Sequence, residues 1–294
     1  SYADDIIDTD NFTYSVMKYP VVLIPAMTST SQPIGTIISS GYASSYYPYY
    51  VFNGDTSSGF SPLWTDSTNT VDGSYDACYV GYEFPYTVRL HSFDLYYYAE
   101  TLCTFTYCIQ ARHNSVWSTV VPTQTSHSNG DYNTTFNLSS YTDCDAIRLC
   151  ILSVTGQSTF YTGSSYDGFI RELRPHGWFL NDLFSCGIEV GSIYSSDGTL
   201  YDRVDRLRTD DYIPITQGKY MISSAGIETM EIFGYYYDTN KSFIEAFGYY
   251  GNWAELPFVF DISGSGYLKF VWHNLNNTSM NVSDIYSAQL VSVS

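Results

Sequence analysis

The sequence predicts an all-β protein, built as two tandem antiparallel β-sandwich domains with a short N-terminal arm. Three observations predict this fold class. Helical periodicity is almost absent along the 294 residues. Short runs of β-branched and aromatic residues recur instead, separated by Gly, Asn, Asp and Ser. The length suits two domains, and an apolar fraction of 44% supplies enough material for packed cores.

The clearest strands show a two-residue alternation. In "TVRLHSFDLYYY" (residues 87–98), Val88, Leu90, Ser92, Asp94 and Tyr96 are expected on one face of the sheet and the residues between them on the other. The segments 103–112, 145–154 and 266–274 follow the same pattern. Strands that recur with turn signals between them are typical of sandwiches rather than of parallel α/β units.

A change in composition near residues 174–187 divides the chain. Before it, long loops rich in Ser, Thr and Asn join the strands, and after it the strands are shorter. We therefore place one sandwich at 27–180 and a second at 181–294. Residues 1–26 contain the acidic "DDIIDTD" and the apolar "VVLIPAM", and they are interpreted as an arm or linker.

The charge balance excludes several classes of partner. The net charge is −18, from 12 Lys and Arg against 30 Asp and Glu, so nucleic acid is not expected as a partner. No apolar run approaches about 18 residues, and no membrane insertion is expected. Only 14% of residues are charged, whereas 31 are tyrosine. A surface of hydroxyls, amides and tyrosine rings is suited to neutral polar ligands.

The six cysteines form no CxxC pair, so a zinc site is not expected. Cys103, Cys108 and Cys150 lie in apolar, strand-like runs, which favours free buried thiols; disulfides remain open at this stage.

Catalytic motifs are absent from the sequence. It contains no Gly-x-Ser-x-Gly, His-Glu-x-x-His or phosphate-binding glycine loop. The neighbouring carboxylates Asp210 and Asp211 would point to opposite faces of a strand and could not share one substrate. We expect a protein that is not an enzyme.

Six segments of the first domain, in order, resemble a discoidin (coagulation-factor C-type) module, a fold shared with many carbohydrate-binding modules. The resemblance covers roughly residues 24–178. It is carried by "ASSYYPYYVFNGD", "SPLWTD", "YVGYEFPYTVRLHSFDLYY", "FTYCIQARHNSVWSTV", "AIRLCIL" and "IRELRPHGW". It implies a galactose-binding-like β-sandwich with its ligand at the loops of one end.

A narrower resemblance links the chain to bacteriophage structural proteins. The stretch "IPAMTSTSQPIGTIISSGYASSYYPYYVFNGD" (24–55) is similar to an opening that recurs in phage tail and other virion proteins. The second domain resembles a jelly-roll module of phage tail and baseplate proteins, often described as carbohydrate-binding. This similarity rests on "IEVGSIYSSDGTLYDRVDRLRTDDYIPI", "YYYDTNKSFIEAF", "GYLKFVWHN" and "DIYSAQLVSV".

The discoidin resemblance also implies a structural calcium at the Asn-Gly turn. The matching ligand positions in this sequence are Phe52 (backbone carbonyl), Asn53, Asp55, Ser58 and Glu172. The family's turn usually has Asp where this chain has Asn53, although Asp55 can restore the charge. The alternative is a turn closed by hydrogen bonds alone.

Ligand-binding rings are expected in the loops. The candidates in the first domain are Tyr42, Tyr46, Tyr47 and Tyr49, with Tyr42 and Tyr46 as the preferred exposed pair. Pro48 favours a loop between Tyr47 and Tyr49. In the second domain the Gly- and Asn-containing loop 248–253 presents Tyr249, Tyr250 and Trp253. Trp64 and Trp117 match core positions of the family, and Trp178 is expected to pack between the domains.

Taken together, these observations predict a non-enzymatic bacteriophage protein that binds carbohydrate on the surface of the host cell. It is expected on the surface of the virion, which is an extracellular particle. Such a receptor-binding appendage would contact other virion proteins and is expected to be a homo-oligomer, a trimer. One alternative is a structural decoration or connecting protein with only protein–protein contacts. Another is a secreted lectin.

Overall fold

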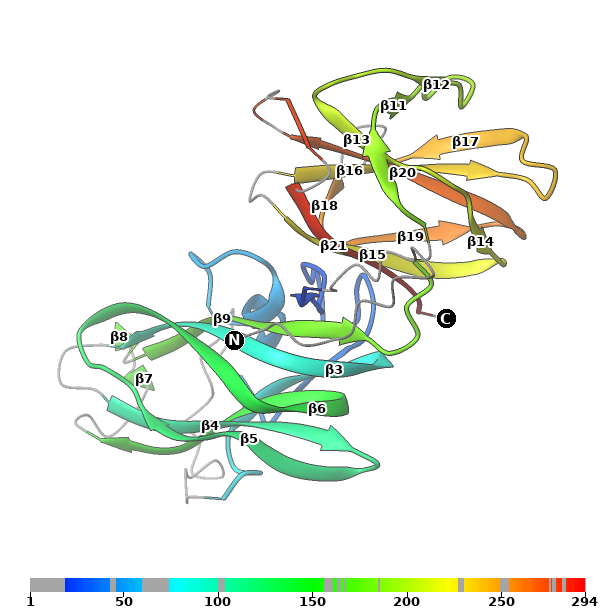
Figure 1. Ribbon diagram of the computed structural model, residues 1–294. Helices are drawn as coiled ribbons and strands as arrows, with labels where there is room; N and C mark the ends of the chain where they lie inside the picture. The colour runs from blue at the N-terminus through cyan, green and yellow to red at the C-terminus, as the bar shows by residue number, and fades with distance from the viewer. Residues whose placement is uncertain are drawn as a thin grey trace.

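The computed structural model describes residues 19–42, 46–59, 74–99, 104–155, 161–162, 165–166, 168–184, 186–226, 230–248, 254–274, 276, 279–281 and 284–293. These residues form antiparallel strands and one short 3-10 helix, η1 (Pro48–Phe52). Figure 1 shows two β-rich bodies side by side, which confirms the predicted all-β fold of two sandwiches. Within the described part of the chain, no helix is both long and apolar enough to span a bilayer.

The first sandwich runs from β1 to β9. Its main sheet has the order β1-β9-β3-β6-β4-β5, and β2 pairs with β3. The strands are β1 (Val21–Val22), β2 (Thr36–Ser39), β3 (Tyr79–Ala99), β4 (Thr104–His113), β5 (Val116–Thr125), β6 (Gly130–Thr155), β7 (Tyr161–Thr162), β8 (Ser165–Tyr166) and β9 (Gly168–Phe179).

The two longest strands connect the layers of this sandwich. The first part of β3 pairs with the end of β6, and β2 and β4 flank this pair. The second part of β3 pairs with the beginning of β6 on one side and with β9 on the other. Rings from the two layers meet in the core, where the Tyr97 and Phe105 centroids lie 5.4 Å apart. One continuous pair of strands thus builds both layers.

The strict alternation predicted for residues 87–98 is wrong at His91. The pairing of β3 with both neighbours shifts register between Leu90 and Ser92. Val88 and Leu90 face the core before the shift, and Phe93, Leu95 and Tyr97 face it afterwards. A β-bulge inserts one residue and exchanges the faces of everything that follows. Asp94 and Tyr96, predicted to share a face with Leu90, therefore point away from the core.

The described cysteines agree with the prediction that the thiols are free and buried. Cys78, Cys108, Cys144 and Cys150 are buried and free, and Cys186 is half-buried and free. Cys103 and Trp64 lie outside the described residues.

Trp117 is not in the core. It is half-buried on β5, which pairs with β4, and the Arg148 guanidinium carbon lies 4.3 Å from its ring centroid. A cation–π contact thus replaces the expected core packing.

The second sandwich contains a larger and a smaller sheet. The larger has the order β10-β13-β20-β16-β17, with β14 on β20 and β18 on β16; the smaller is β19-β15-β21. The strands are β10 (Ile188–Val190), β11 (Ser192–Ile193), β12 (Leu200–Tyr201), β13 (Arg206–Thr209), β14 (Ile213–Ile215), β15 (Gly218–Gly226), β16 (Met230–Tyr237), β17 (Phe243–Phe247), β18 (Ala254–Glu255), β19 (Phe258–Ile262), β20 (Gly266–Asn274) and β21 (Ile285–Ser292). Its core is built around the fully buried Trp272 and Phe270.

The two sandwiches share a packed junction. The Ser223 hydroxyl of β15 donates to the Val22 carbonyl of β1 (2.9 Å). The backbone N–H of Phe179 donates to the buried Gln289 side chain (2.9 Å). Met221 belongs to the same apolar cluster as the first core. Figure 1 shows β15 and β21 on the side of the second body that faces β9. Strand β1, within the segment interpreted as an arm, pairs with β9 and joins both bodies.

Candidate functional site

The outer face of the β6–β3–β9 sheet concentrates polar and aromatic side chains. We call this surface the outer face, and the strand register defines its residues. On β3 they are Arg89, Ser92, Asp94, Tyr96 and Tyr98. On β6 they are Asp131, Asn133, Thr135, Asn137 and Asp143, and on β9 they are Arg174, His176 and Trp178. The opposite side of the same strands supplies the core, with Leu95, Tyr97 and Leu173. Alternation along the strands, interrupted by bulges, thus leaves one face free for recognition.

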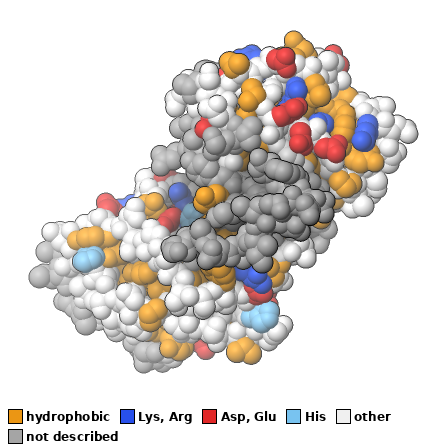
Figure 2. All heavy atoms as spheres, viewed as in Figure 1, with side chains coloured by type: hydrophobic (Ala, Val, Ile, Leu, Met, Phe, Trp, Pro, Cys, Tyr) orange, Lys and Arg blue, Asp and Glu red, His pale blue; other side chains and the backbone are white. Residues whose placement is uncertain are grey.

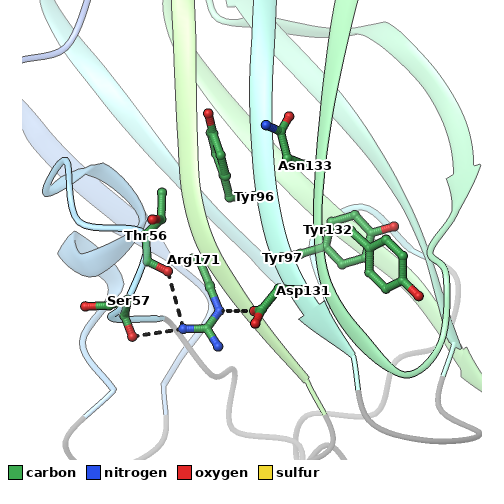
Figure 3. A pocket seen from close by; sticks show the side chains of 8 residues that line it. All are labelled: Thr56, Ser57, Tyr96, Tyr97, Asp131, Tyr132, Asn133 and Arg171. Carbon is green, nitrogen blue, oxygen red and sulfur yellow. Dashed lines mark hydrogen bonds and ion pairs between the residues drawn. The ribbon is translucent and has the colours of Figure 1, made fainter.

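A pocket lies where β3 ends and β6 and β9 begin. We call it the strand-end pocket; it has a volume of about 450 Å³ and is lined by Thr56, Ser57, Tyr96, Asp131, Asn133 and Arg171. Tyr97 and Tyr132 complete the lining. Figure 3 shows Arg171 between the turn that bears Thr56 and Ser57 and the Asp131 carboxylate, with Tyr96 and Asn133 farther along the same face.

Arg171 is fixed from three directions. Its Nη1 donates to the carbonyls of Thr56 (3.3 Å) and Ser57 (2.9 Å). Its Nε lies 2.8 Å from Asp131 Oδ1, and its guanidinium carbon lies 5.6 Å from the Tyr98 ring centroid. Because the ion pair balances the charge, the pocket offers a rigid, nearly neutral set of donors and acceptors.

The turn at residues 53–58 borders this pocket and holds the predicted calcium ligands. Asn53 Oδ1 accepts from the N–H of Asp55 (2.9 Å), and Asn53 Nδ2 donates to the Ser58 hydroxyl (2.9 Å). Asp55 Oδ1 accepts from the N–H and the hydroxyl of Ser57 (2.8 and 2.6 Å). These hydrogen bonds make a self-contained Asx turn.

Glu172 lies beneath the turn and is only 3% exposed. Its Oε2 accepts from the N–H of Gly54 (3.2 Å), and Arg174 Nε lies 3.2 Å from its Oε1. Arg174 Nη2 also donates to the Gly54 carbonyl (3.2 Å). Burial raises the pKa of Glu172 to about 7, since desolvation outweighs the pKa-lowering effect of Arg174 and of the Gly54 N–H.

These contacts bear on the predicted calcium. Asn53, Asp55 and Ser58 lie in one turn and Glu172 lies beneath it, but their oxygens already accept or donate hydrogen bonds within the chain. The fifth predicted ligand, the Phe52 carbonyl, accepts from the N–H of Met27 (2.8 Å). In the described part of the chain, no three His, Cys, Asp or Glu side chains gather as a metal site. In this arrangement the residues do not fit a calcium ion, which would have to displace Arg174 from Glu172. Calcium stays a prediction.

The predicted loop tyrosines gather around η1. Tyr42 and Tyr47 are each 40% exposed, with ring centroids 5.6 Å apart. Tyr49 stacks on Tyr47 at 5.7 Å, and Tyr46 is half-buried. Tyr249, Tyr250 and Trp253 lie outside the described residues, so their predicted role remains a prediction.

Sequence reasoning missed the lining of the strand-end pocket. The two-residue alternation predicts Tyr96 on the face of Leu90, because the bulge at His91 leaves no mark in the sequence. Arg171 and Asp131 are forty residues apart and meet only through the register of β3 with its two neighbours. The run "YYY" (96–98) at the end of β3 was the one local signal for exposed rings.

No protein-family model matches the chain, and no curated protein matches it. Part of the chain is similar to solved structures. One is the family 32 carbohydrate-binding module of AlyQ in complex with 4,5-unsaturated mannuronic acid, with 15% identity, 48% of this chain and 92% of that chain covered, and a TM-score of 0.35. Another is the family 32 module of Clostridium perfringens NanJ in complex with galactose, with 14% identity, 48% and 93% covered, and a TM-score of 0.36. A third is chitosan-binding module 2 of a Paenibacillus chitosanase/glucanase in complex with chitotriose, with 14% identity, 49% and 96% covered, and a TM-score of 0.35.

Proposed function

We propose that this chain is a carbohydrate-binding protein and that the strand-end pocket of the first sandwich takes a sugar residue. The pocket itself carries the proposal, because an aromatic ring, an exposed amide and a neutralised arginine line one hollow of about 450 Å³. That volume lies within the range typical of small-ligand sites.

The chemistry of the lining is suited to a neutral sugar. The half-buried Tyr96 ring offers a flat apolar surface for the C–H face of a pyranose, and the Arg174 guanidinium carbon lies 5.7 Å from its centroid. Asn133 can donate to and accept from hydroxyl groups, and Asp131 can accept. In the view of Figure 2 the coloured surface is mostly uncharged, and charged side chains gather more on the second sandwich. The net charge of −18 disfavours polyanionic glycans.

The proposed protein binds its glycan and does not cleave it. Glycoside hydrolysis generally requires two carboxyl groups that flank the scissile bond. Among the described residues that line the strand-end pocket, Asp131 is the one carboxylate, and it is paired with Arg171. A pocket of this kind holds a sugar and supplies no acid–base pair.

We further propose that the chain acts on the surface of a bacteriophage virion, as a receptor-binding appendage that attaches to the host cell. The support is the resemblance of residues 24–55 and of the second domain to phage virion proteins. A shallow sugar site binds weakly by itself, and display of several copies, as in a trimer, would multiply the strength of attachment.

A glycan array with matched tyrosine variants tests the proposal. The wild-type chain should bind at least one neutral glycan, and Tyr96→Ala should weaken that binding by roughly tenfold or more, equivalent to about 1.4 kcal/mol. The control is Tyr75→Ala, which removes a tyrosine that is 44% exposed and does not line the pocket. Loss of binding in Tyr42→Ala with Tyr96→Ala unaffected would move the site to the η1 tyrosines. No binding across a broad array would contradict the proposed function and favour a structural protein.

A further inference from the structure

The outer face has a second pocket at its other end. This pocket has a volume of about 400 Å³ and is lined by Arg89, His113, Tyr141, Thr142 and Asp143. Arg89 and Asp143 form a two-point ion pair, with Nε to Oδ1 at 2.7 Å and Nη2 to Oδ2 at 3.1 Å. As at Arg171 in the strand-end pocket, a carboxylate fixes the arginine and neutralises its charge.

Aromatic rings lie beside this second pocket. Tyr141 is 52% exposed, and its ring centroid lies 5.0 Å from that of Trp178 and 5.7 Å from that of His91. Trp178, predicted to pack between the domains, is instead half-buried on the outer face, with its ring 5.5 Å from His91. The second pocket thus shares three features with the first: a tyrosine ring, an arginine paired with a carboxylate, and a threonine hydroxyl.

A hydrogen-bonded polar row connects the two pockets. Asp94 lies on β3 between Arg89 and Tyr96, where its Oδ1 accepts from the Thr135 hydroxyl (2.6 Å) and its Oδ2 lies 2.8 Å from His176 Nε2. Two residues before Asp94 on β3, Ser92 lies opposite Asn137 of β6. Since Thr135 and His176 hold the Asp94 carboxylate in place, this part of the surface between the pockets presents preorganised polar groups.

The separation of the pockets exceeds one sugar ring. Tyr96 of the first pocket and Arg89 of the second are seven residues apart on β3. One of these residues is the extra one of the bulge, so about six residues at about 3.3 Å each separate the pockets by roughly 20 Å. A single pyranose can occupy one pocket but cannot reach the other. A linear glycan laid along the strand can contact both pockets and the polar row between them.

We propose that the two pockets are the end subsites of one binding surface for a linear, uncharged oligosaccharide that lies along β3. This inference rests on the proposed function, and it specifies the ligand as an internal stretch of a glycan chain rather than a terminal sugar. Tyr96 is the stacking ring of one end and Tyr141 that of the other. The Asp94–His176–Thr135 group binds hydroxyls in the middle.

Affinity as a function of chain length tests the inference. The probes are cello-, laminari-, chito- and manno-oligosaccharides from monosaccharide to hexasaccharide, titrated calorimetrically against the full chain. The hexasaccharide of at least one series should bind at least tenfold more tightly than its monosaccharide. Tyr141→Ala and Tyr96→Ala should each remove most of that gain, because each deletes the stacking ring at one end of the surface. Tyr75→Ala serves as the control, and the melting temperatures of all variants verify folding.

The outcomes separate this inference from the function on which it rests. If monosaccharide and hexasaccharide bind equally, or if Tyr141→Ala leaves hexasaccharide affinity unchanged, the extended surface is wrong and a single-pocket lectin remains. If no probe in any series binds, the extended surface is wrong, and the array result decides whether sugar binding fails with it.

Discussion

Glu172 provides a test of the structure that is independent of any ligand. Its carboxyl group is buried under the Asn-Gly turn, in contact with the Gly54 N–H and with Arg174. Desolvation raises its pKa from 4.5 to about 7, so the folded protein holds this proton more tightly than the unfolded chain does. The perturbation is Glu172→Gln, which keeps the shape of the protonated group and removes its titration.

The size and sign of the effect follow from the two pKa values. Between pH 4.5 and about pH 7 the folded state binds more protons than the unfolded state, so stability falls as pH rises through this window. Each unit of pKa difference corresponds to about 1.4 kcal/mol, and the full difference of about 2.5 gives a loss of about 3 kcal/mol. The stabilisation from the Glu172 proton is fully present below pH 4.5, the pKa of Glu172 in the unfolded chain. It is lost once the pH exceeds about 7, the pKa of Glu172 in the folded protein.

Urea unfolding of the wild-type and Glu172→Gln chains across this pH range measures the effect. The difference between their unfolding free energies removes the titrations that both proteins share. We expect the wild type to lose about 3 kcal/mol relative to Glu172→Gln as pH rises through the window. A difference that stays flat, or that changes in favour of the wild type at high pH, would refute the burial and pairing described for Glu172.

Two further predictions concern the same domain. If a structural calcium binds, millimolar CaCl₂ should raise the urea midpoint of the wild type at mildly alkaline pH, and Glu172→Gln should abolish this gain. An unchanged wild-type midpoint would mean that Arg174 and the turn's own hydrogen bonds hold the turn without a metal ion. A binding protein should leave its glycan intact, so prolonged incubation with a glycan that binds on the array should release no new reducing ends. Steady release that Asp131→Asn abolishes would contradict the non-enzymatic proposal.

The sequence predicted the fold class because two-residue alternation and turn residues are local signals. The strands at 103–112 and 266–274 appear within one residue as β4 and β20. The bulge at His91 was not predictable, since any residue can be the extra one and only pairing with two neighbouring strands reveals it. For the residues of β3 after the bulge, including Asp94 and Tyr96, the face predicted from the alternation is therefore wrong.

In the candidate site, too, residues close in sequence were predictable and residues far apart in sequence were not. Their closeness in sequence around Pro48 predicts Tyr42, Tyr46, Tyr47 and Tyr49 as one group of rings, and the structure brings the rings of Tyr42, Tyr47 and Tyr49 together. The pairs Arg171–Asp131 and Arg89–Asp143 join residues 40 and 54 positions apart. Their partners are set by strand order and register, which no short motif encodes.

The central claim is that the outer face of the first sandwich binds sugar, and the position of a bound glycan tests it most directly. A crystal structure of the chain in complex with the glycan that binds most tightly gives that position. We predict a sugar ring stacked on Tyr96, within hydrogen-bond distance of Asn133 or Asp131. A glycan found only at the η1 tyrosines, or only on the second sandwich, would contradict the account.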